Sequence, residues 1–264
     1  MWTSPPTPLL RRGGLIQVFP LVTCLLLLIS CTHWKVQKTE TKHFAITEPE
    51  VDSQIVKMIL PYKTTLDEKM NVVIGFAPEA LIKKLPESNL GNFFSDAMYQ
   101  RAMQIQNTDT AHLVAMFNSG GLRTSVPEGE IRVRNMFELM PFENELVLLP
   151  IKGSQLQIIL NGIADKGGAP LAGVRFKIAN HKAEDIFVHQ IALDTNIVYT
   201  ITTSDYLANG GDKFFNIETL IPITIGVTKT NLLLRDILID YCQNLYKQNK
   251  TITGAIDGRI STAK

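Results

Sequence analysis

A glycine turn followed by an arginine is the first pattern in this sequence that can do chemistry. Asn118-Ser119-Gly120-Gly121 comes after a short apolar run, and glycine allows a turn whose backbone a ligand can approach closely. Arg123 then places a fixed positive charge beside exposed backbone N–H groups. The turn predicts the end of a strand and a place for an anionic group. Alternatively, Arg123 pairs at the surface with Glu128 or Glu130.

An aromatic residue and an amide follow within the same stretch, Met116–Leu146. Phe142 offers a flat apolar face, and Asn144 offers an amide that both donates and accepts hydrogen bonds. Together with the turn and the arginine, they can hold a flat, anionic ligand such as a nucleotide. The sequence leaves structural alternatives open. Phe142 can be a core aromatic, and Asn144 can simply close the loop before the next strand.

Two further blocks carry polar residues in patterns that can contact a ligand. One is Glu87-Ser88-Asn89-Leu90-Gly91-Asn92, followed by Asp96, and the other runs from Ser204 to Asp212 through a second glycine turn. In the second block Tyr206 adds a ring and Asp212 a carboxylate, although Tyr206 can be a core residue and Asp212 an ordinary turn residue. Asp96 lies beside apolar positions of a helical pattern, which favours a structural role.

The composition allows a sizeable core and does not favour a nucleic-acid partner. The chain has 264 residues, is 45% hydrophobic and has a formal net charge of +1. Without residues 1–30, which contain two of the 26 basic residues and no acidic one, 24 basic residues face 25 acidic ones. A protein that tracks a phosphate backbone needs a dense basic surface, and no such stripe is visible.

The N-terminus resembles a bacterial lipoprotein signal. Arg11 and Arg12 precede an apolar run, Leu15–Ile29, that is too short and too close to the terminus for a typical spanning helix. Leu28-Ile29-Ser30-Cys31 resembles a lipobox, which implies cleavage before Cys31 and a lipid on its sulfur. The alternative is an ordinary secretory signal or an N-terminal anchor in which Cys31 is incidental.

These features predict three regions: a signal peptide over residues 1–30, a polar, lysine-rich tether over 31–47, and one domain over 48–264. Cys24 leaves with the signal and Cys31 carries the lipid. Cys242 alone then remains, so the mature chain has no intrachain disulfide. Its place within a helical pattern favours a small core residue.

Apolar periodicity predicts interleaved helices and strands, which is typical of a mixed α/β (α+β) domain. The predicted helices are residues 51–70 with a possible break at Pro61, Asn89–Gln106 with Asn89 as its cap, a helix capped by Ser154, and Thr230–Lys247. The predicted strands are Asn71–Phe76, Leu113–Phe117, Glu145–Ile151, Val174–Ile178, Ile186–Leu193 and Val198–Thr203.

Four blocks in order carry a resemblance to a known family: ESNLGNFFSDAM, NSGGLR, MPFEN and YTITTSDYLANGGDKF. They resemble the C-terminal domain of the 5′-nucleotidase and UDP-sugar hydrolase family over about residues 50 to 260. Any one block is weak evidence, but four with similar order and spacing are specific. The resemblance implies layered helices and mixed β-sheets.

The resemblance also implies that this domain binds the nucleoside part of a substrate. Two aromatic rings that sandwich the base match Phe142 and Tyr206. Asn144 matches an amide that contacts the base, and Asp212 a carboxylate that accepts hydrogen bonds from ribose hydroxyls. Arg123 matches an arginine close to the phosphates and carboxylates of the substrate.

The remaining expected contacts are Asn118, which matches a position that reaches the substrate in some members, and the turn residues Gly120 and Gly121. Lys84 stands by spacing where the family usually has an arginine. Lysine is a point charge without the bidentate fork of arginine, so a weaker or differently oriented contact is expected.

A catalytic metal centre is not expected in this chain. In full-length members the resemblance assigns catalysis to an N-terminal metallophosphatase domain with two divalent metals. The five histidines here do not stand in a D-x-H or G-N-H-[DE] pattern; they are His33, His43, His112, His181 and His189. We therefore expect no catalytic residue and no metal or other cofactor of its own. The metals are expected on a separate metallophosphatase chain.

The leading hypothesis is a lipid-anchored nucleotide- or nucleoside-recognition half of a 5′-nucleotidase-type hydrolase. The alternatives are a non-catalytic lipoprotein that binds nucleosides or another small ligand, and a degenerate scaffolding domain. The lipoprotein resemblance places the chain at the bacterial cell envelope, periplasmic or surface-exposed. Thr32 after Cys31 is not the acidic residue linked to inner-membrane retention, which favours the outer membrane.

Overall fold

The computed structural model describes residues 38–42, 44, 52–106, 111–213 and 226–263. The chain divides into the units Met1–Asp52 and Ser53–Lys264. The expected signal peptide and Cys31 lie outside the described residues, as does most of the expected tether. Within the described ranges, no helix is both long enough and apolar enough to cross a membrane.

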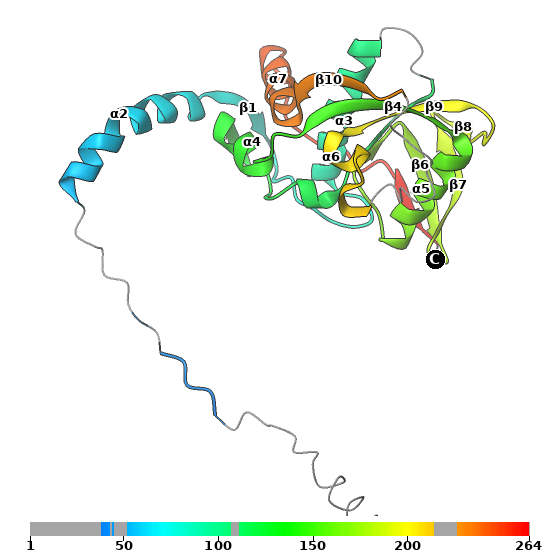
Figure 1. Cartoon of the computed structure of the whole chain (residues 1–264), viewed down its shortest axis with the longest axis horizontal. Coiled ribbons are helices and arrows are strands. Elements are labelled where there is room, and N and C mark those ends of the chain that lie inside the picture. The colour runs from blue at the N-terminus through cyan, green and yellow to red at the C-terminus, as the bar shows by residue number, and fades with distance from the viewer. Residues whose placement is uncertain (1–37, 43, 45–51, 107–110, 214–225, 264) are drawn as a thin grey trace, which may run out of the picture. The chain divides into compact units, whose positions relative to one another are not determined.

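The second unit interleaves helices and strands (Figure 1). Its helices are α2 (Ser53–Met70), α3 (Asn89–Gln106), α4 (Val133–Leu139), α5 (Gly153–Asp165), α6 (Asp205–Ala208) and α7 (Leu234–Lys247), with 3-10 turns η1 (Ser119–Gly121) and η2 (Gly211–Lys213). Its strands are β1 (Val73–Ala77), β2 (Leu113–Met116), β3 (Gly129–Arg132), β4 (Glu145–Lys152), β5 (Leu171–Ala172), β6 (Val174–Ala179), β7 (Lys182–Val188), β8 (Ile191–Ala192), β9 (Val198–Ser204), β10 (Thr228–Leu233) and β11 (Ile260–Thr262). The predicted mixed α/β class is confirmed.

A five-stranded sheet in the order β10-β4-β9-β2-β5 forms the centre of this unit. Figure 1 shows β10, β4 and β9 side by side. β2 and β9 run parallel, whereas β4 runs antiparallel to β9. Parallel neighbours end at the same edge of a sheet, and an antiparallel neighbour begins there. The segments after β2 and β9 and the segment before β4 therefore meet at one edge.

β2 is buried along its whole length because hydrophobic clusters cover both of its faces. Val114 and Met116 belong to the cluster that contains the apolar side of α5, while Ala115 and Phe117 belong to the cluster around α3 and α7. Alternate strand residues point to opposite faces, so burial on both sides explains a continuous apolar run.

Two smaller sheets complete the fold. The order β11-β6-β7-β8 forms one, and β1 pairs with β3 in the other. In β6, Val174 and Phe176 are buried and Arg175 is exposed, whereas Lys177 and Ile178 are both half-buried. Cys242 is fully buried on α7, as predicted, and burial raises the pKa of its thiol to about 12. The thiol is therefore protonated at neutral pH.

Two side chains cap the start of α3. The Asn89 side chain accepts the Leu90 N–H at 2.9 Å, as predicted, and the Ser88 hydroxyl accepts the Gly91 N–H at 3.0 Å. The Asn89 side chain also accepts the Ile82 N–H at 2.8 Å and so ties the preceding loop to the helix. α5 begins at Gly153, before the predicted cap Ser154.

Two predicted elements are divided. The strand predicted over Ile186–Leu193 is a hairpin, because His189 and Gln190 adopt φ values of 47° and 69° and turn the chain between β7 and β8. The helix predicted over Thr230–Lys247 starts only at Leu234. The residues before it pair with β4, which overrides their helical periodicity.

α2 continues through Pro61, so the possible break predicted there does not occur. Proline lacks an N–H and leaves the carbonyl of Lys57 without its helical partner. Both residues are exposed, so water can bond to that carbonyl. The cost of the proline is therefore small enough for the helix to persist.

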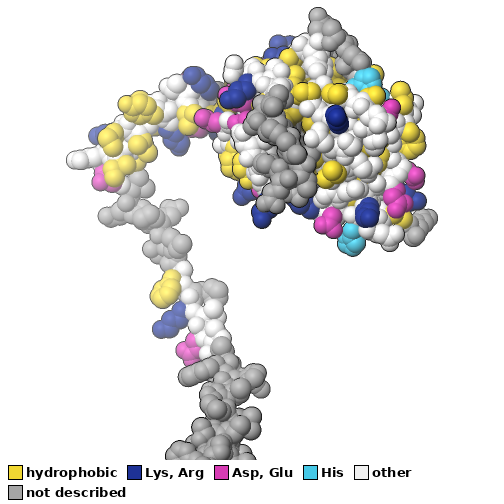
Figure 2. All heavy atoms as spheres, turned by 45° about the vertical axis from the view of Figure 1, so that its right-hand side comes forward, with side chains coloured by type: hydrophobic (Ala, Val, Ile, Leu, Met, Phe, Trp, Pro, Cys, Tyr) yellow, Lys and Arg dark blue, Asp and Glu magenta, His cyan; other side chains and the backbone are white. Residues whose placement is uncertain are grey.

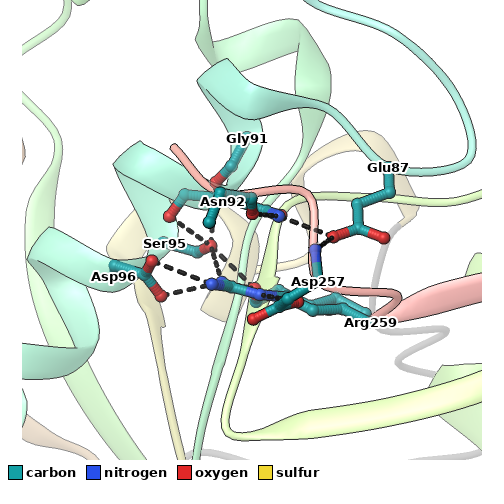
Figure 3. Close-up of polar contacts among 9 residues, drawn as sticks. Glu87, Gly91, Asn92, Ser95, Asp96, Asp257 and Arg259 are labelled. Atoms are coloured by element: carbon teal, nitrogen blue, oxygen red, sulfur yellow. Dashed lines mark hydrogen bonds and ion pairs between the residues drawn. The ribbon is translucent and has the colours of Figure 1, made fainter. Parts of the chain in front are cut away.

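Arg259 holds the C-terminal segment against α3 (Figure 3). Its guanidinium donates to both carboxylate oxygens of Asp96, at 2.7 and 2.8 Å, and to Asp257 at 3.0 Å. It also donates to the carbonyl oxygen of Leu171 at 2.7 Å. Burial raises the pKa of the Asp96 carboxyl, and the hydrogen bond and charge of Arg259 oppose that rise. Asp96 thus joins two distant segments, in agreement with the structural role predicted for it.

Candidate functional site

The edge where β2 and β9 end and β4 begins brings together three loops that the sequence separates. Side-chain hydrogen bonds fix the meeting point. The Thr203 hydroxyl on β9 donates to the carbonyl oxygen of Met116 on β2 at 2.7 Å. The Asp205 carboxylate accepts the Glu145 N–H at the start of β4, at 3.1 Å. The loops are therefore anchored where they leave the sheet.

A cavity of about 280 Å³ opens between these loops. It is lined by Asn118, Gly120, Gly121, Arg123, Phe142, Asn144, Tyr206 and Asp212. All of them were candidates from the sequence alone. Of the predicted binding residues, only Lys84 lies elsewhere, in an adjoining cavity.

Phe142 and Tyr206 present their rings at the surface of this cavity. Phe142 is 42% exposed and Tyr206 is 45% exposed, so the alternative interpretation of both as core residues is wrong. The carbonyl oxygen of Asn144 accepts the Leu234 N–H at 2.9 Å, so Asn144 does close its loop against α7. Its side chain still lines the cavity.

Arg123 is held over the cavity by uncharged neighbours. Its guanidinium donates to the carbonyl oxygen of Gly120 at 3.2 Å and lies 5.8 Å from the centre of the Phe142 ring. Glu130, one of the acidic partners considered for it, pairs instead with Arg132 at 2.7 Å. Because the Gly120 carbonyl and the Phe142 ring carry no net negative charge, the charge of Arg123 remains available to an anionic ligand.

Asp212 occupies a turn and lines the cavity at the same time. Its φ is 55°, a left-handed conformation that Asp and Asn tolerate better than most residues. The Tyr206 hydroxyl donates to one carboxylate oxygen at 2.9 Å, and the Asn118 amide donates to the other. The hydrogen bond to Asp212 is the main cause of a raised pKa for the Tyr206 hydroxyl. A carboxylate has about four acceptor positions, so acceptor capacity remains for a ligand.

Gly211 is required for this arrangement. A β-carbon at this position would lie 2.3 Å from the Tyr206 ring, which is far inside van der Waals contact. Glycine therefore leaves room for the ring against the turn, where its hydroxyl contacts the neighbouring carboxylate. This is the structural reason for the second glycine turn found in the sequence.

A second cavity of about 420 Å³ adjoins the first and is rich in lysine. The two share Asn118, Gly120 and Asp212 as lining residues. Three lysines line the second one: Lys83, Lys84 and Lys166. Such a cluster favours an anionic group next to whatever occupies the first cavity.

Sequence reasoning missed two of these lysines. Lys166 follows α5 and donates to the backbone carbonyl of Asp212 at 3.3 Å, a contact across 46 positions that no local pattern indicates. Lys83 donates to the carbonyl oxygen of Leu122 at 2.7 Å. Its neighbour Lys84 was noticed only through spacing relative to the family, and the same argument could have included Lys83.

In the part of the chain that the structure describes, no group of three or more His, Cys, Asp or Glu side chains lies close enough to hold a metal ion. The site thus consists of aromatic rings, amides, a carboxylate and cations.

Residues 72–218, more than half of the chain, match the sequence model for the 5′-nucleotidase, C-terminal domain. The chain belongs to this family.

Individual relatives agree with the family. The chain is 28% identical over 181 residues to a 5′-nucleotidase from Vibrio vulnificus, which covers 65% of this chain and 31% of the relative. It is 27% identical over 196 residues to the protein UshA from Yersinia enterocolitica, covering 70% and 34%. It therefore spans about a third of the length of these two relatives.

Solved structures give the same result for the fold. The 5′-nucleotidase precursor from Thermus thermophilus superposes with a TM-score of 0.65 at 26% identity, covering 79% of this chain and 43% of that one. The NAD nucleotidase of Haemophilus influenzae superposes with a TM-score of 0.58 at 20% identity. The layered arrangement predicted for the 5′-nucleotidase C-terminal domain is therefore the fold of this chain.

Proposed function

We propose that this chain is the nucleotide- or nucleoside-recognition half of a 5′-nucleotidase-type hydrolase, and that a separate metallophosphatase chain cuts the phosphoester. One observation carries the proposal. Two exposed rings, an amide, a carboxylate and an arginine line a single cavity of about 280 Å³. These are the groups needed for a base, a ribose and an anion.

In this proposal the base stacks on Phe142 and Tyr206, a contact worth roughly 1–3 kcal/mol per base. Asn144 contacts the edge of the base, and Asp212 accepts hydrogen bonds from the ribose hydroxyls. Arg123 lies near the anionic part of the substrate. The support is that all five side chains line the same cavity.

The phosphate lies toward the adjoining cavity, where Lys83, Lys84 and Lys166 supply positive charge. The cavities share Asn118 and Gly120, so one ligand can reach both. Holding the nucleoside at fixed points removes orientational freedom from the phosphoester, which lowers the barrier to reaction. This positioning is the whole contribution that we assign to the chain.

Divalent metals on the partner would polarise the phosphoryl group and activate the attacking water. The sequence supports placing the metals on the partner, because it contains neither metallophosphatase histidine motif.

The proposal also includes a location: the bacterial cell envelope, with a lipid on Cys31 that holds the domain in the periplasm or at the surface. The lipobox-like stretch before that cysteine is its support.

Calorimetric titration of the purified domain with adenosine and AMP tests the recognition role. We expect both ligands to bind, and the double variant Phe142→Ala, Tyr206→Ala to bind at least about tenfold more weakly because both stacking faces are lost. Phe187→Ala is the matched control, since this phenylalanine is 37% exposed but lies outside the cavity. Absence of binding, or equal binding by all three proteins, would favour a scaffolding domain.

An AMP hydrolysis assay with added Mg²⁺, Mn²⁺ or Zn²⁺ tests the division of labour. We expect the isolated chain to release phosphate no faster than a metal-free control. Robust metal-dependent AMP hydrolysis by the chain alone would contradict the proposal that a separate metallophosphatase chain cuts the phosphoester. Tight binding without any gain of turnover beside a metallophosphatase chain would instead favour a non-catalytic nucleoside-binding lipoprotein.

A further inference from the structure

In the part of the chain that the structure describes, two charged residues are buried, Arg235 and Arg259. The other charged side chains are at least partly exposed, and Figure 2 shows many of them spread over the surface. Arg259 is explained by its ion pairs with Asp96 and Asp257. Arg235 has different neighbours, and they point to a role at the cavity.

Uncharged groups surround the guanidinium of Arg235. It lies 4.1 Å from the centre of the Phe137 ring and donates to the carbonyl oxygen of Met140 through a long hydrogen bond of 3.4 Å. The Asp236 carboxylate, 4.0 Å away, is at the limit of an ion pair and is 61% exposed. Among the described residues, the Nε atom of Arg235 has no hydrogen-bond partner. A buried cation with so little compensation costs free energy, so stability alone does not explain this arginine.

The contacts of Arg235 are to the point where the chain leaves α4. The last carbonyl groups of a helix need donors from outside the helix. The carbonyl oxygen of Leu139, the last residue of α4, accepts the backbone N–H of Arg123 at 2.9 Å. The next carbonyl, that of Met140, accepts from the side chain of Arg235. One of these two arginines, Arg123, itself lines the cavity.

The start of α7 holds both ends of the segment Met140–Asn144. Arg235 binds the carbonyl at its first residue, and the N–H of Leu234 binds the carbonyl at its last residue at 2.9 Å. Phe142 stands at the centre of this segment and is 42% exposed. Because packing covers little of the ring, its position depends on the backbone that α7 fixes on either side.

We propose that Arg235 is a positioning residue that sets where the ring of Phe142 stands in the cavity. This inference rests on the proposed function, which supplies a base for the ring to stack on. A binding site that is loose by about 1 Å loses much of its effect. Arginine suits the role better than lysine, because its planar guanidinium can stack on Phe137 and donate to Met140 at the same time.

Calorimetric titration of the purified chain with adenosine tests the proposal. Arg235→Met should weaken adenosine binding at least about fivefold, which is the lower end of the range for losing one stacked face. In a Phe142→Ala background the same substitution should change the affinity less than about twofold, because the ring through which Arg235 acts is already absent. A merely structural role would lower the fraction of protein that binds, seen in the stoichiometry, and leave the affinity unchanged.

Arg134→Met is the matched control. This arginine also belongs to α4 but pairs with Asp67 of α2 at 3.3 Å and does not line the cavity, so adenosine affinity should equal that of the parent. Phe137→Leu is a second test that does not depend on the folding of Arg235→Met. It keeps an apolar side chain but removes the aromatic face under the guanidinium, so it should also weaken adenosine binding.

Hydrogen exchange without ligand measures the anchoring directly. The amides of Arg123 and Leu234, which donate to Leu139 and Asn144, should exchange at least about threefold faster in Arg235→Met, while the amides of β9 keep the parent rate. Unchanged exchange at both amides would overturn the inference.

Two calorimetric outcomes separate this inference from the proposed function. Equal adenosine affinity in Arg235→Met and the parent would overturn the positioning role and leave nucleoside recognition standing, as would an equal loss in the Phe142→Ala background. A parent protein that binds no adenosine would overturn the proposed function, and the positioning role with it.

Discussion

Two aspartates in this domain are held by neighbouring donors, but they are held in different ways. Asp96 receives both of its hydrogen bonds from a single buried cation, Arg259, at 2.7 and 2.8 Å. Asp212 receives one from the Tyr206 hydroxyl at 2.9 Å and another from the Asn118 amide. The first pair of contacts comes from a cation, whereas both donors of the second pair are neutral.

The kind of donor distinguishes a carboxylate with a structural role from one that can bind a ligand. The side chain of Arg259 is 11% exposed, and its hydrogen bonds also go to Asp257 and a backbone carbonyl. Removing Arg259 leaves two half-exposed carboxylates, Asp96 and Asp257, without their cation, so we assign the cluster to stability. Around Asp212 the donors are neutral and face a cavity, so ligand hydroxyls can add to or replace them at little cost.

The largest expected effect is on the structural aspartate. Arg259→Met should lower the free energy of unfolding by about 2–3 kcal/mol, below the 3–5 kcal/mol of fully buried pairs because Asp96 is 39% exposed. Urea denaturation monitored by circular dichroism measures it. Arg175→Met, at an exposed arginine, is the control and should stay within about 0.5 kcal/mol of the parent.

A second variant makes this prediction sharper. Asp96→Leu combined with Arg259→Met removes the bidentate ion pair and should recover part of the lost stability, because the only carboxylate of the cluster that remains is Asp257, which is 45% exposed and can be hydrated. Adenosine affinity of the folded protein should not change, since neither residue lines the cavity. A single variant as stable as the parent would show that the cluster is not what holds the C-terminal segment.

The next effect concerns the cavity aspartate and appears in binding rather than in stability. Asp212→Asn should weaken adenosine binding roughly tenfold to a hundredfold, because a hydrogen bond to a charged group contributes about 1.5–3 kcal/mol. Asparagine keeps the left-handed backbone that Asp212 adopts, so unfolding should change by less than about 0.5 kcal/mol. Calorimetry measures the affinity.

The matched control for this variant is a change of ligand. 2′,3′-Dideoxyadenosine lacks the 2′- and 3′-hydroxyls from which the carboxylate would accept hydrogen bonds, so parent and Asp212→Asn proteins should bind it equally. If the variant loses affinity for both ligands to the same extent, the carboxylate acts on the shape of the turn and not on the ribose. In that case Asp212 would have a structural role like that of Asp96.

The smallest effect is a change in titration. The hydrogen bond to Asp212 raises the pKa of Tyr206 above its ordinary value near 10. The contribution of this hydrogen bond to the free energy of unfolding is present below pH 10 and is lost as the pH rises through the raised pKa of Tyr206. Asp212→Asn removes the negative acceptor, so the pKa of Tyr206 should return toward 10. NMR titration of the tyrosine ring signals measures this shift, and an unchanged pKa would contradict the contact.

Much of the candidate site follows from residue types and local order. Glycine turns, a proline–phenylalanine step and a Tyr–Asp block are local features that make Phe142, Tyr206 and Asp212 candidates, and the resemblance of four ordered blocks to a known family assigns them to one ligand. Strands buried on both faces are also recognisable locally, as the run Leu113–Phe117 is. Whether a ring is core or surface is not local, because that depends on what packs against it.

The sequence by itself determined the mixed α/β class, the order of the motifs and the chemical groups available to a ligand. Only the tertiary structure decided which of them meet. β2 runs parallel to β9 and β4 runs antiparallel to it, which brings three separate loops to one edge. Lys166 reaches Asp212 across 46 positions, and Arg259 reaches Asp96 across 163. Such contacts depend on strand order and register, which no window of local sequence contains.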